Sequence, residues 1–367
     1  MQALVENPLP AEVSGGLIGL IGDHPSAYSR SPQIWHAALR HLGLDATYQP
    51  LDVPADRLGA VLDTLRVMPA CWGANVTVPY KEAVIPLLDE IEPAASAVGA
   101  INTIVRRPDG RLIGANTDGV GVVAALLDRE HGPPLLETLY GTDVLLIGAG
   151  GAARAAAVAL AGLLGTGELL VTNRSVARAA DVVARAGACG ARARVVDDAR
   201  LDEHLSSVAL VINASIRGQA GIRTVPTGWT SLEPYSALAP AAPAVIPPGP
   251  EHEFAAAWAP RSAADIEANH ARSRARVRLL PRDAVVVDMI YAPPETVTMR
   301  HAREAGLRAV NGRWMMIVQA AEACLAHVCA GAIATRGPER EALRREVIAV
   351  MAAAWDARDG AQAQQGT

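Results

Sequence analysis

One stretch of the chain, residues 143–178, constrains the fold more than any other. An apolar run at 144–147 leads into the glycine-rich segment GAGGAAR, and an alanine-rich run then continues to residue 164. A second apolar run follows at 169–172. A strand, a glycine turn, a helix and a second strand in this order form the unit that binds dinucleotides. The stretch therefore predicts a Rossmann-type domain.

The glycine-rich segment predicts where the diphosphate of a dinucleotide binds. Gly148 allows a tight turn, Gly150 lets the backbone approach the diphosphate, and Ala153 takes the place of a third glycine. Amides at the start of the helix would hold the phosphates. Glycine turns also join strands to helices without any ligand, so the prediction depends on the flanking strand and helix.

The end of the second predicted strand distinguishes NADP from NAD. An NAD site usually has Asp or Glu there for the ribose 2′-hydroxyl, whereas an NADP site tends to have Arg near the 2′-phosphate. This segment supplies donors and two cations without an acid: Asn173, Arg174, Ser175 and Arg178. A solvated helix start is the alternative explanation. We expect NADP to be the cofactor.

Length and composition limit the classes of protein that remain. The chain has 367 residues, enough for two domains, and its net charge of −5 gives no general attraction to nucleic acid. It has no apolar run that would span a bilayer and no signal-peptide pattern at its start. We expect a cytoplasmic protein that binds neither membrane nor metal, with reduced thiols at Cys71, Cys189, Cys324 and Cys329.

Polar residues follow several predicted strands in the first third of the chain. Ser29 and Ser31 precede a predicted helix at 33–42, where they would either cap the helix or bind a small anion or polyol. Lys81 ends a strand before a helix predicted at 82–91. That is a ligand position in open α/β sheets, although a lone lysine is usually a solvated charge. Asn and Asp beside Gly at 116–119 usually form turns.

Three further segments have their own expected organisation. Residues 1–15 are expected to be a loose tail, and helices are expected from 312 through 327 and at 339–355. Repeated prolines and alternate arginines at 272–278 predict an insertion at about 217–282, partly mobile, with a short helix near 265–273. The insertion would be a lid, a subunit contact or a tolerated excursion.

Eight motifs in fixed order resemble those of the shikimate dehydrogenase family. They are SRSP at 29–32, NVTVPYK at 75–81, NT at 102–103, NTDG at 116–119, GAGGA at 148–152, NRS at 173–175, NAS at 213–215 and GRWMMIVQ at 312–319. The resemblance covers roughly residues 16–215 and 284–330, which is most of the chain. It departs from the family pattern at the insertion and at Arg313 and Trp314, which replace a usual Leu-Gly pair.

The resemblance implies an α/β fold in two parts, an N-terminal α/β substrate domain plus a Rossmann-type dinucleotide-binding domain with a cleft between them. The substrate domain would comprise residues 1–117, completed by C-terminal helices at 313–356. The NADP-binding domain would comprise residues 118–312 and contain the insertion. The implied reaction is the reversible, NADPH-dependent reduction of 3-dehydroshikimate to shikimate, in aromatic amino acid biosynthesis.

The resemblance also implies the roles of individual residues. Hydride delivery to a ketone leaves negative charge on the oxygen, so a nearby proton donor or cation lowers the barrier. The implied catalytic pair is Lys81 and Asp118. The implied substrate-binding set is Ser29, Ser31, Thr77, Lys81, Asn102, Asp118, Tyr291 and Gln319. The implied cofactor set is Gly148, Ala149, Gly150, Gly151, Ala152, Asn173, Arg174, Ser175, Arg178, Ala214, Ser215, Met289 and Gly312.

Two alternatives share most of these motifs. Relatives that act on quinate or aminoshikimate would have the same catalytic pair. A regulatory sensor of the same small acids would lack the Lys81 and Asp118 pair or would add a DNA-binding module, and the chain has the pair and no evident helix-turn-helix. We therefore expect an enzyme, either a monomer or a homodimer.

Overall fold

The structure is a computed structural model that describes residues 1–10, 15–129, 133–334 and 340–365. It divides into two compact units: unit 1 comprises Met1–Ala124 and Met315–Thr367, and unit 2 comprises Ala125–Trp314. Each unit is built on its own six-stranded sheet. The substrate-binding and NADP-binding roles expected for the two domains, and the cleft expected between them, stay predictions.

The sheet of unit 1 brings four strand ends to one edge. Its order is β2-β1-β3-β5-β6-β4. Strand β1 is parallel to β2 and β3, β5 is antiparallel to β3 and β6, and β4 is parallel to β6. The carboxyl ends of β1, β3 and β6 therefore lie beside the amino end of β5. The strands are Gly16–Gly22 (β1), Ala46–Asp52 (β2), Cys71–Val76 (β3), Glu90–Ile91 (β4), Thr103–Arg106 (β5) and Leu112–Ala115 (β6).

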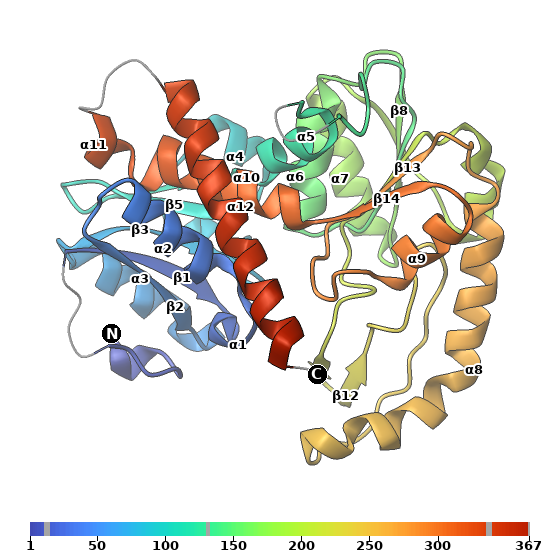
Figure 1. Cartoon of the computed structure of the whole chain (residues 1–367), viewed down its shortest axis with the longest axis horizontal. Helices are drawn as coiled ribbons and strands as arrows, with labels where there is room; N and C mark the ends of the chain where they lie inside the picture. The colour runs from blue at the N-terminus through green and yellow to red at the C-terminus, as the bar shows by residue number, and fades with distance from the viewer. Residues whose placement is uncertain (11–14, 130–132, 335–339, 366–367) are drawn as a thin grey trace. The chain divides into compact units, whose positions relative to one another are not determined.

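Figure 1 shows the helices of unit 1 around this sheet. In α2 the faces of Ile34, Trp35 and Leu39 are buried, and Trp35 stacks on Tyr48 of β2 with 4.8 Å between ring centroids. The helices of unit 1 are α1 Pro25–Tyr28, α2 Ser31–His41, α3 Leu58–Val67, α4 Pro93–Val98, α10 Arg313–Glu322 from Met315 on, α11 Ala330–Ile333 and α12 Arg340–Gln365. A π-helical segment, η6 Ala323–Val328, follows α10, and short 3₁₀ turns are η1 Gln2–Leu4, η2 Ala55–Arg57 and η3 Ile85–Leu87. Helix α5, Asp118–Leu127, runs from unit 1 into unit 2.

Two expectations for unit 1 are wrong. The helix predicted at 82–91 is absent, and η3 and β4 replace it. Pro86 lies in the middle of that segment and has no amide hydrogen to continue a helix. The expected loose tail is packed, because the Asn7 side chain donates to the Pro50 carbonyl (3.0 Å) and accepts from the Asp52 amide (2.8 Å). Residues 11–14 of that tail lie outside the described residues.

The sheet of unit 2 is parallel throughout, with the order β14-β13-β10-β7-β8-β9. The strand order reverses between β7 and β10, which is where open sheets of this kind bind ligands. This confirms the predicted Rossmann-type fold. The strands are Val144–Ile147 (β7), Glu168–Thr172 (β8), Arg192–Val195 (β9), Leu210–Asn213 (β10), Val285–Asp288 (β13) and Arg308–Asn311 (β14). They are connected by α6 Gly151–Ala161, α7 Val176–Ala188, α9 Val297–Glu304 and the 3₁₀ turns η4 Asp198–Glu203 and η5 Leu205–Ser207.

The insertion has regular secondary structure. It contains a hairpin of β11 Ile222–Val225 and β12 Gly228–Ser231, and a long helix, α8 Glu251–Val277, which encloses the short helix predicted near 265–273. Figure 1 shows α8 as one long helix at the edge of unit 2. Its first half packs in a small aromatic core with Tyr235, Phe254 and Trp258, and its last residue belongs to the main core of unit 2.

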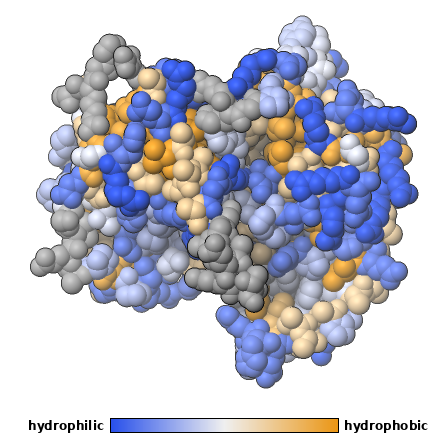
Figure 2. Space-filling model, viewed as in Figure 1, coloured by the Kyte–Doolittle hydropathy of each residue, from blue (hydrophilic) through white to orange (hydrophobic). Residues whose placement is uncertain are grey.

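Figure 2 shows hydrophilic side chains over most of the visible face of each unit, with smaller hydrophobic areas between them. Within the described ranges, no helix combines the length and the apolar character that a membrane crossing requires.

Candidate active site and cofactor site

The predicted catalytic pair meets at the shared strand edge of unit 1. Lys81 follows β3 and Asp118 begins α5 just after β6. The Lys81 Nζ donates to Asp118 Oδ2 at 2.6 Å, and the two side chains are 19% and 4% exposed. Among the 33 Lys and Arg residues of the sequence, Lys81 is the only lysine. A solvated surface charge does not describe this residue.

Two other predicted residues, Asn102 and Gln319, join the same buried network. Asn102 precedes β5, and its Nδ2 lies 2.9 Å from Asp118 Oδ1 and 3.1 Å from Gln319 Oε1. Gln319 comes from α10, 217 residues further along the chain. Four of the predicted residues (Lys81, Asn102, Asp118 and Gln319) are thereby held in one hydrogen-bonded group.

The network contains residues that the predicted site left out. Thr117 Oγ1 lies 3.0 Å from Asn102 Nδ2 and donates to the Gln319 carbonyl at 3.0 Å. Asn75 Nδ2 lies 3.2 Å from Thr103 Oγ1, and Asn75 Oδ1 accepts from the Tyr48 hydroxyl at 2.9 Å. Asn75, Thr103 and Thr117 lie inside the motif segments, which is the signal that could have found them.

Three other predicted substrate residues lie at the same edge of unit 1 without joining this network. Ser29 Oγ accepts from the Ser31 amide at 3.1 Å, and Arg30 is the N-cap of α2, without a capping bond from its side chain. Ser29 therefore accepts the first amide of α2 from one position before the N-cap, and Ser31 is the first residue of the helix. The Thr77 amide donates to the Ile21 carbonyl at 2.9 Å. As far as the structure describes the chain, no hydrogen bond links these three to Lys81 or Asn102.

The glycine turn of unit 2 has the shape that a diphosphate needs. Gly148 has φ +118°, and a Cβ there would lie 2.9 Å from the backbone of Ala214, so only glycine fits. Gly150 is the N-cap of α6, and a Cβ there would meet no atom within 4 Å. The start of α6, where Gly151 and Ala152 are the first two helical residues, therefore has open space beside Gly150. Ala149 and Ala153 are buried against the sheet.

The end of β8 presents positive charge and no carboxylate of its own. Ser175 is the N-cap of α7 and accepts from the Arg178 amide at 3.4 Å, while Asn173 donates to the Ser175 carbonyl at 3.1 Å. The solvated helix start thus explains Ser175 and Asn173 locally. The guanidinium groups of Arg174 and Arg178 are exposed at the same strand end. Two cations at this strand end fit a 2′-phosphate.

The remaining predicted cofactor residues lie at the ends of β10, β13 and β14. A Cβ on Gly312 would lie 2.1 Å from the Met289 carbonyl oxygen, so glycine lets these two loops touch. Ser215 donates through its amide (3.0 Å) and its hydroxyl (2.7 Å) to Asn213 Oδ1, which fixes the loop containing Ala214. Tyr291 is half-buried in unit 2, three residues after β13 ends.

A buried carboxyl that sequence reasoning missed supports these loops. Asp288 is fully buried and accepts hydrogen bonds from Asn213 Nδ2 (2.9 Å) and Thr296 Oγ1 (2.7 Å). Burial raises the pKa of Asp288 to about 6, although the hydrogen bonds from Thr296, Asn213 and the Ile290 amide act in the opposite direction.

The two residues that depart from the family pattern start α10. Trp314 Nε1 donates to Asp128 Oδ2 at 3.3 Å, and the Arg313 amide donates to Asn311 Oδ1 at 3.1 Å. The indole is therefore held within unit 2 by a local acid.

Comparison with known proteins identifies the family of this chain. The family model described as "Shikimate dehydrogenase substrate binding domain" matches residues 20–104, and the one described as "Shikimate / quinate 5-dehydrogenase" matches residues 133–223. The chain is 36% identical over 312 residues to the NADP(+) shikimate dehydrogenase of Symbiobacterium thermophilum, covering 84% of this chain and 87% of the relative.

Solved structures give the same result. A shikimate dehydrogenase from Thermus thermophilus in complex with NADP(H) and shikimate matches with a TM-score of 0.59 and 28% identity, over 91% of this chain and 99% of that one. A quinate dehydrogenase from Corynebacterium glutamicum in complex with NAD matches with a TM-score of 0.63 and 25% identity, over 90% and 98%. The predicted family and fold are confirmed: this chain belongs to the shikimate dehydrogenase family.

Proposed function

We propose that this protein is an NADP-dependent shikimate dehydrogenase that reversibly reduces 3-dehydroshikimate to shikimate. The observation that supports this best is the buried contact between Lys81 Nζ and Asp118 Oδ2, made by the only lysine of a chain in this family. A dehydrogenase needs a proton donor and cation at the reacting oxygen, and this pair supplies both.

Lys81 is the group that we assign to the proton transfer. Its ammonium stabilises the negative charge that develops on the substrate oxygen and gives that oxygen a proton from Nζ. In the direction of shikimate oxidation, Nζ takes the proton back. Asp118 fixes the direction of the ammonium through its Oδ2 at 2.6 Å and is itself held by Asn102 at 2.9 Å.

Hydroxyls of the substrate ring would bind to the same network. Asn102 and Gln319 present amide groups whose mutual contact of 3.1 Å holds them in place, and Thr77 lies at the same strand edge. We assign the substrate carboxylate to the hydroxyls of Ser29 and Ser31, joined by Tyr291. Neutral hydroxyls suit this role because they donate to a carboxylate without a second buried charge.

The cofactor assignment depends on the shape and charge of unit 2. When bound, the nicotinamide of NADPH supplies the hydride. Amides at the start of α6 would hold the diphosphate, and Arg174 and Arg178 would hold the 2′-phosphate. The touching loops at Met289 and Gly312 would border the nicotinamide.

The wider setting is part of the same proposal. All four cysteines have free thiols, which suits a reducing cytoplasm. We propose a cytoplasmic enzyme of aromatic amino acid biosynthesis that acts as a monomer or homodimer.

The substrate is tested by a panel of cyclohexanoid acids. Purified protein is mixed with NADP+ and with shikimate, quinate or aminoshikimate, and the absorbance of the reduced cofactor gives kcat/KM for each. We expect shikimate to give the highest value. A higher value for quinate would favour the activity named for the Corynebacterium glutamicum structure. Shikimate binding without turnover of any acid would contradict an enzyme and favour a sensor.

A further inference from the structure

Arg217 lies at the start of the insertion and beside the proposed cofactor loop. Its amide donates to Ser215 Oγ at 3.2 Å, and its carbonyl accepts from Asn213 Nδ2 at 3.0 Å. Asn213 pairs with Ile147 of β7, which in turn pairs with Thr172 of β8. The backbone of Arg217 is therefore fixed on one side of the glycine turn, with the end of β8 on the other side.

The side chain of Arg217 is a half-buried cation held by neutral groups. Its Nη1 donates to the carbonyls of Ala237 (3.1 Å) and Ala239. Throughout the described ranges, no carboxylate forms an ion pair with it. Burial is the main cause that lowers the pKa of Arg217; the charge of Arg174 acts in the same direction, whereas the charges of Asp198 and Asp265 act in the opposite direction. Arg217 follows β10 and Arg174 follows β8, the two strands on either side of β7, so both cations start from the carboxyl edge of the sheet, where an anion can bind.

The insertion fixes the segment that holds Arg217. From α8, Asn269 Nδ2 contacts the carbonyls of Ala239 (3.2 Å) and Pro240 (2.9 Å), and its Oδ1 accepts from the Ser236 amide at 2.8 Å. The fully buried Arg276 donates to the Leu238 carbonyl at 2.8 Å.

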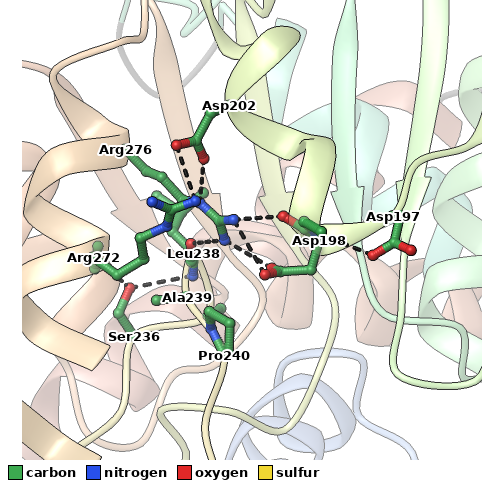
Figure 3. A network of polar contacts seen from close by, with 12 residues as sticks. Asp197, Asp198, Asp202, Ser236, Leu238, Ala239, Pro240, Arg272 and Arg276 are labelled. Carbon is green, nitrogen blue, oxygen red and sulfur yellow. Dashed lines mark hydrogen bonds and ion pairs between the residues drawn. The ribbon is translucent and has the colours of Figure 1, made fainter. Parts of the chain in front are cut away.

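Arg276 is itself anchored to the Rossmann-type unit. Figure 3 shows its guanidinium between Asp198 and Asp202, which it contacts at 2.7 Å and 2.8 Å. Residues 236–240 are thus held from the helix side by Asn269 and Arg276, and they hold Arg217 in turn.

We propose that Arg217, positioned by the insertion, binds the 2′-phosphate of NADP together with Arg174. This inference rests on the proposed cofactor site and adds a residue to it, and it gives the insertion a function in cofactor selection. Arg217 is a specificity residue in this account, whereas Asn269 is a positioning residue that acts through the carbonyl of Ala239.

The test compares binding of NADP+ and NAD+ by calorimetry to the wild-type protein, Arg217→Met and Arg217→Lys. A charge-assisted bond is worth roughly 1.5–3 kcal/mol, so Arg217→Met should weaken NADP+ by a factor of about 10 to 100. Binding of NAD+ should change less than about twofold, which also shows that the variant is folded. Arg217→Lys keeps the charge without the planar fork and should lie between the two.

Two results would overturn the assignment. If Arg217→Met weakened the binding of NADP+ and NAD+ equally, Arg217 would lie at the diphosphate. If it left the binding of both cofactors unchanged, Arg217 would not belong to the site. The variant Arg174→Ala distinguishes a failure of the role assigned to Arg217 from a failure of the proposed 2′-phosphate site. If Arg174→Ala weakens NADP+ and Arg217→Met does not, only the inference about Arg217 fails. If neither variant affects NADP+, the proposed 2′-phosphate site itself fails.

A further variant, Asn269→Ala, tests the role of the insertion. Asn269→Ala should weaken NADP+ severalfold and leave NAD+ unchanged, because it releases the carbonyls that hold Arg217. The exposed Arg278, just beyond α8, provides the control, and Arg278→Met should leave both affinities unchanged. Equal effects of Asn269→Ala on the two cofactors would contradict a positioning role and indicate a structural one.

Discussion

At the scale of single residues, Lys81 differs from every other cation in the chain. Elsewhere the chain uses arginine, which is always charged and does not readily exchange a proton. Lysine is a compact point charge that can give up a proton, and here it is mostly buried beside Asp118. This position is the one where the proposed reaction needs a proton donor.

Replacing Lys81 should abolish most of the chemistry without affecting cofactor binding. We expect Lys81→Ala to lower kcat for shikimate oxidation by a factor on the order of 10²–10⁴, because both the proton donor and the cation are lost. Binding of NADP+, measured separately, should change little. The matched control is Lys81→Arg, which keeps the charge and should still bind shikimate. Near-normal turnover of Lys81→Ala would show that Lys81 is not catalytic.

Asp288 should make stability depend on pH. Its folded-state pKa of about 6 lies well above the ordinary pKa of an aspartate, so the folded protein binds the proton more tightly than the unfolded chain does. The stabilisation is fully present below about pH 4 and is lost as the pH rises through about 6. This difference between the folded and unfolded pKa of Asp288 corresponds to roughly 3 kcal/mol in the free energy of unfolding.

The comparison with Asp288→Asn isolates this effect. Buried His301 has its pKa lowered to about 4 by burial first and by Arg274 second, so its contribution has the opposite sign over the same pH range. Denaturant unfolding of both proteins at several pH values removes that shared contribution. As the pH rises from about 4 to 7, the free energy of unfolding of Asp288→Asn should increase relative to that of the wild type. A difference between the two proteins that stays constant with pH would contradict the raised pKa of Asp288.

Sequence motifs predicted some residues of the site and missed others. Motif segments predicted that Lys81, Asn102, Asp118 and Gln319 belong to one site, and the fold places them in one network. Arg217 and Asp288 were not predicted. Their significance comes from burial and from partners far along the chain, such as Ala237 and Thr296, which no local pattern contains.

At the scale of secondary-structure elements, strands were predicted better than connections. The apolar runs that became β7 and β8 were located correctly, because short buried strands have a clear signal. The secondary structure of the insertion was predicted only in part, as a short helix near 265–273. Its prolines suggested a loop, yet Pro260 lies inside α8, and the alternate arginines include the fully buried Arg276. Ion pairs with Asp198 and Asp202, from a distant 3₁₀ turn, make that burial possible.

Removing Arg276 should therefore loosen the insertion. Arg276→Met should lower the free energy of unfolding by about 2–4 kcal/mol, toward the lower end because Asp198 and Asp202 are partly exposed and can be solvated. Trypsin should then cut α8 faster at its remaining arginines. Arg278→Met is the exposed control and should change stability by less than about 0.5 kcal/mol. Equal effects of the two substitutions would contradict the anchoring role of Arg276.

At the scale of the whole molecule, the two units contain different parts of the proposed machinery. Unit 1 contains the Lys81 network, and unit 2 contains the glycine turn and the arginines at the end of β8. Ordered motifs over most of the chain were enough to predict this family and its two-part fold. How the chain separates shikimate from related acids was not predictable, because that choice depends on the fit of side chains around one ring.

The most direct test of the whole account is kcat/KM for shikimate oxidation by the wild-type protein with NADP+ and with NAD+. A single charge-assisted bond to the 2′-phosphate is worth roughly 1.5–3 kcal/mol, and two or more arginines are available. We therefore predict efficient shikimate-dependent reduction of NADP+, favoured over NAD+ by at least about tenfold. A protein that does not oxidise shikimate with either cofactor, or that prefers NAD+, would contradict the account.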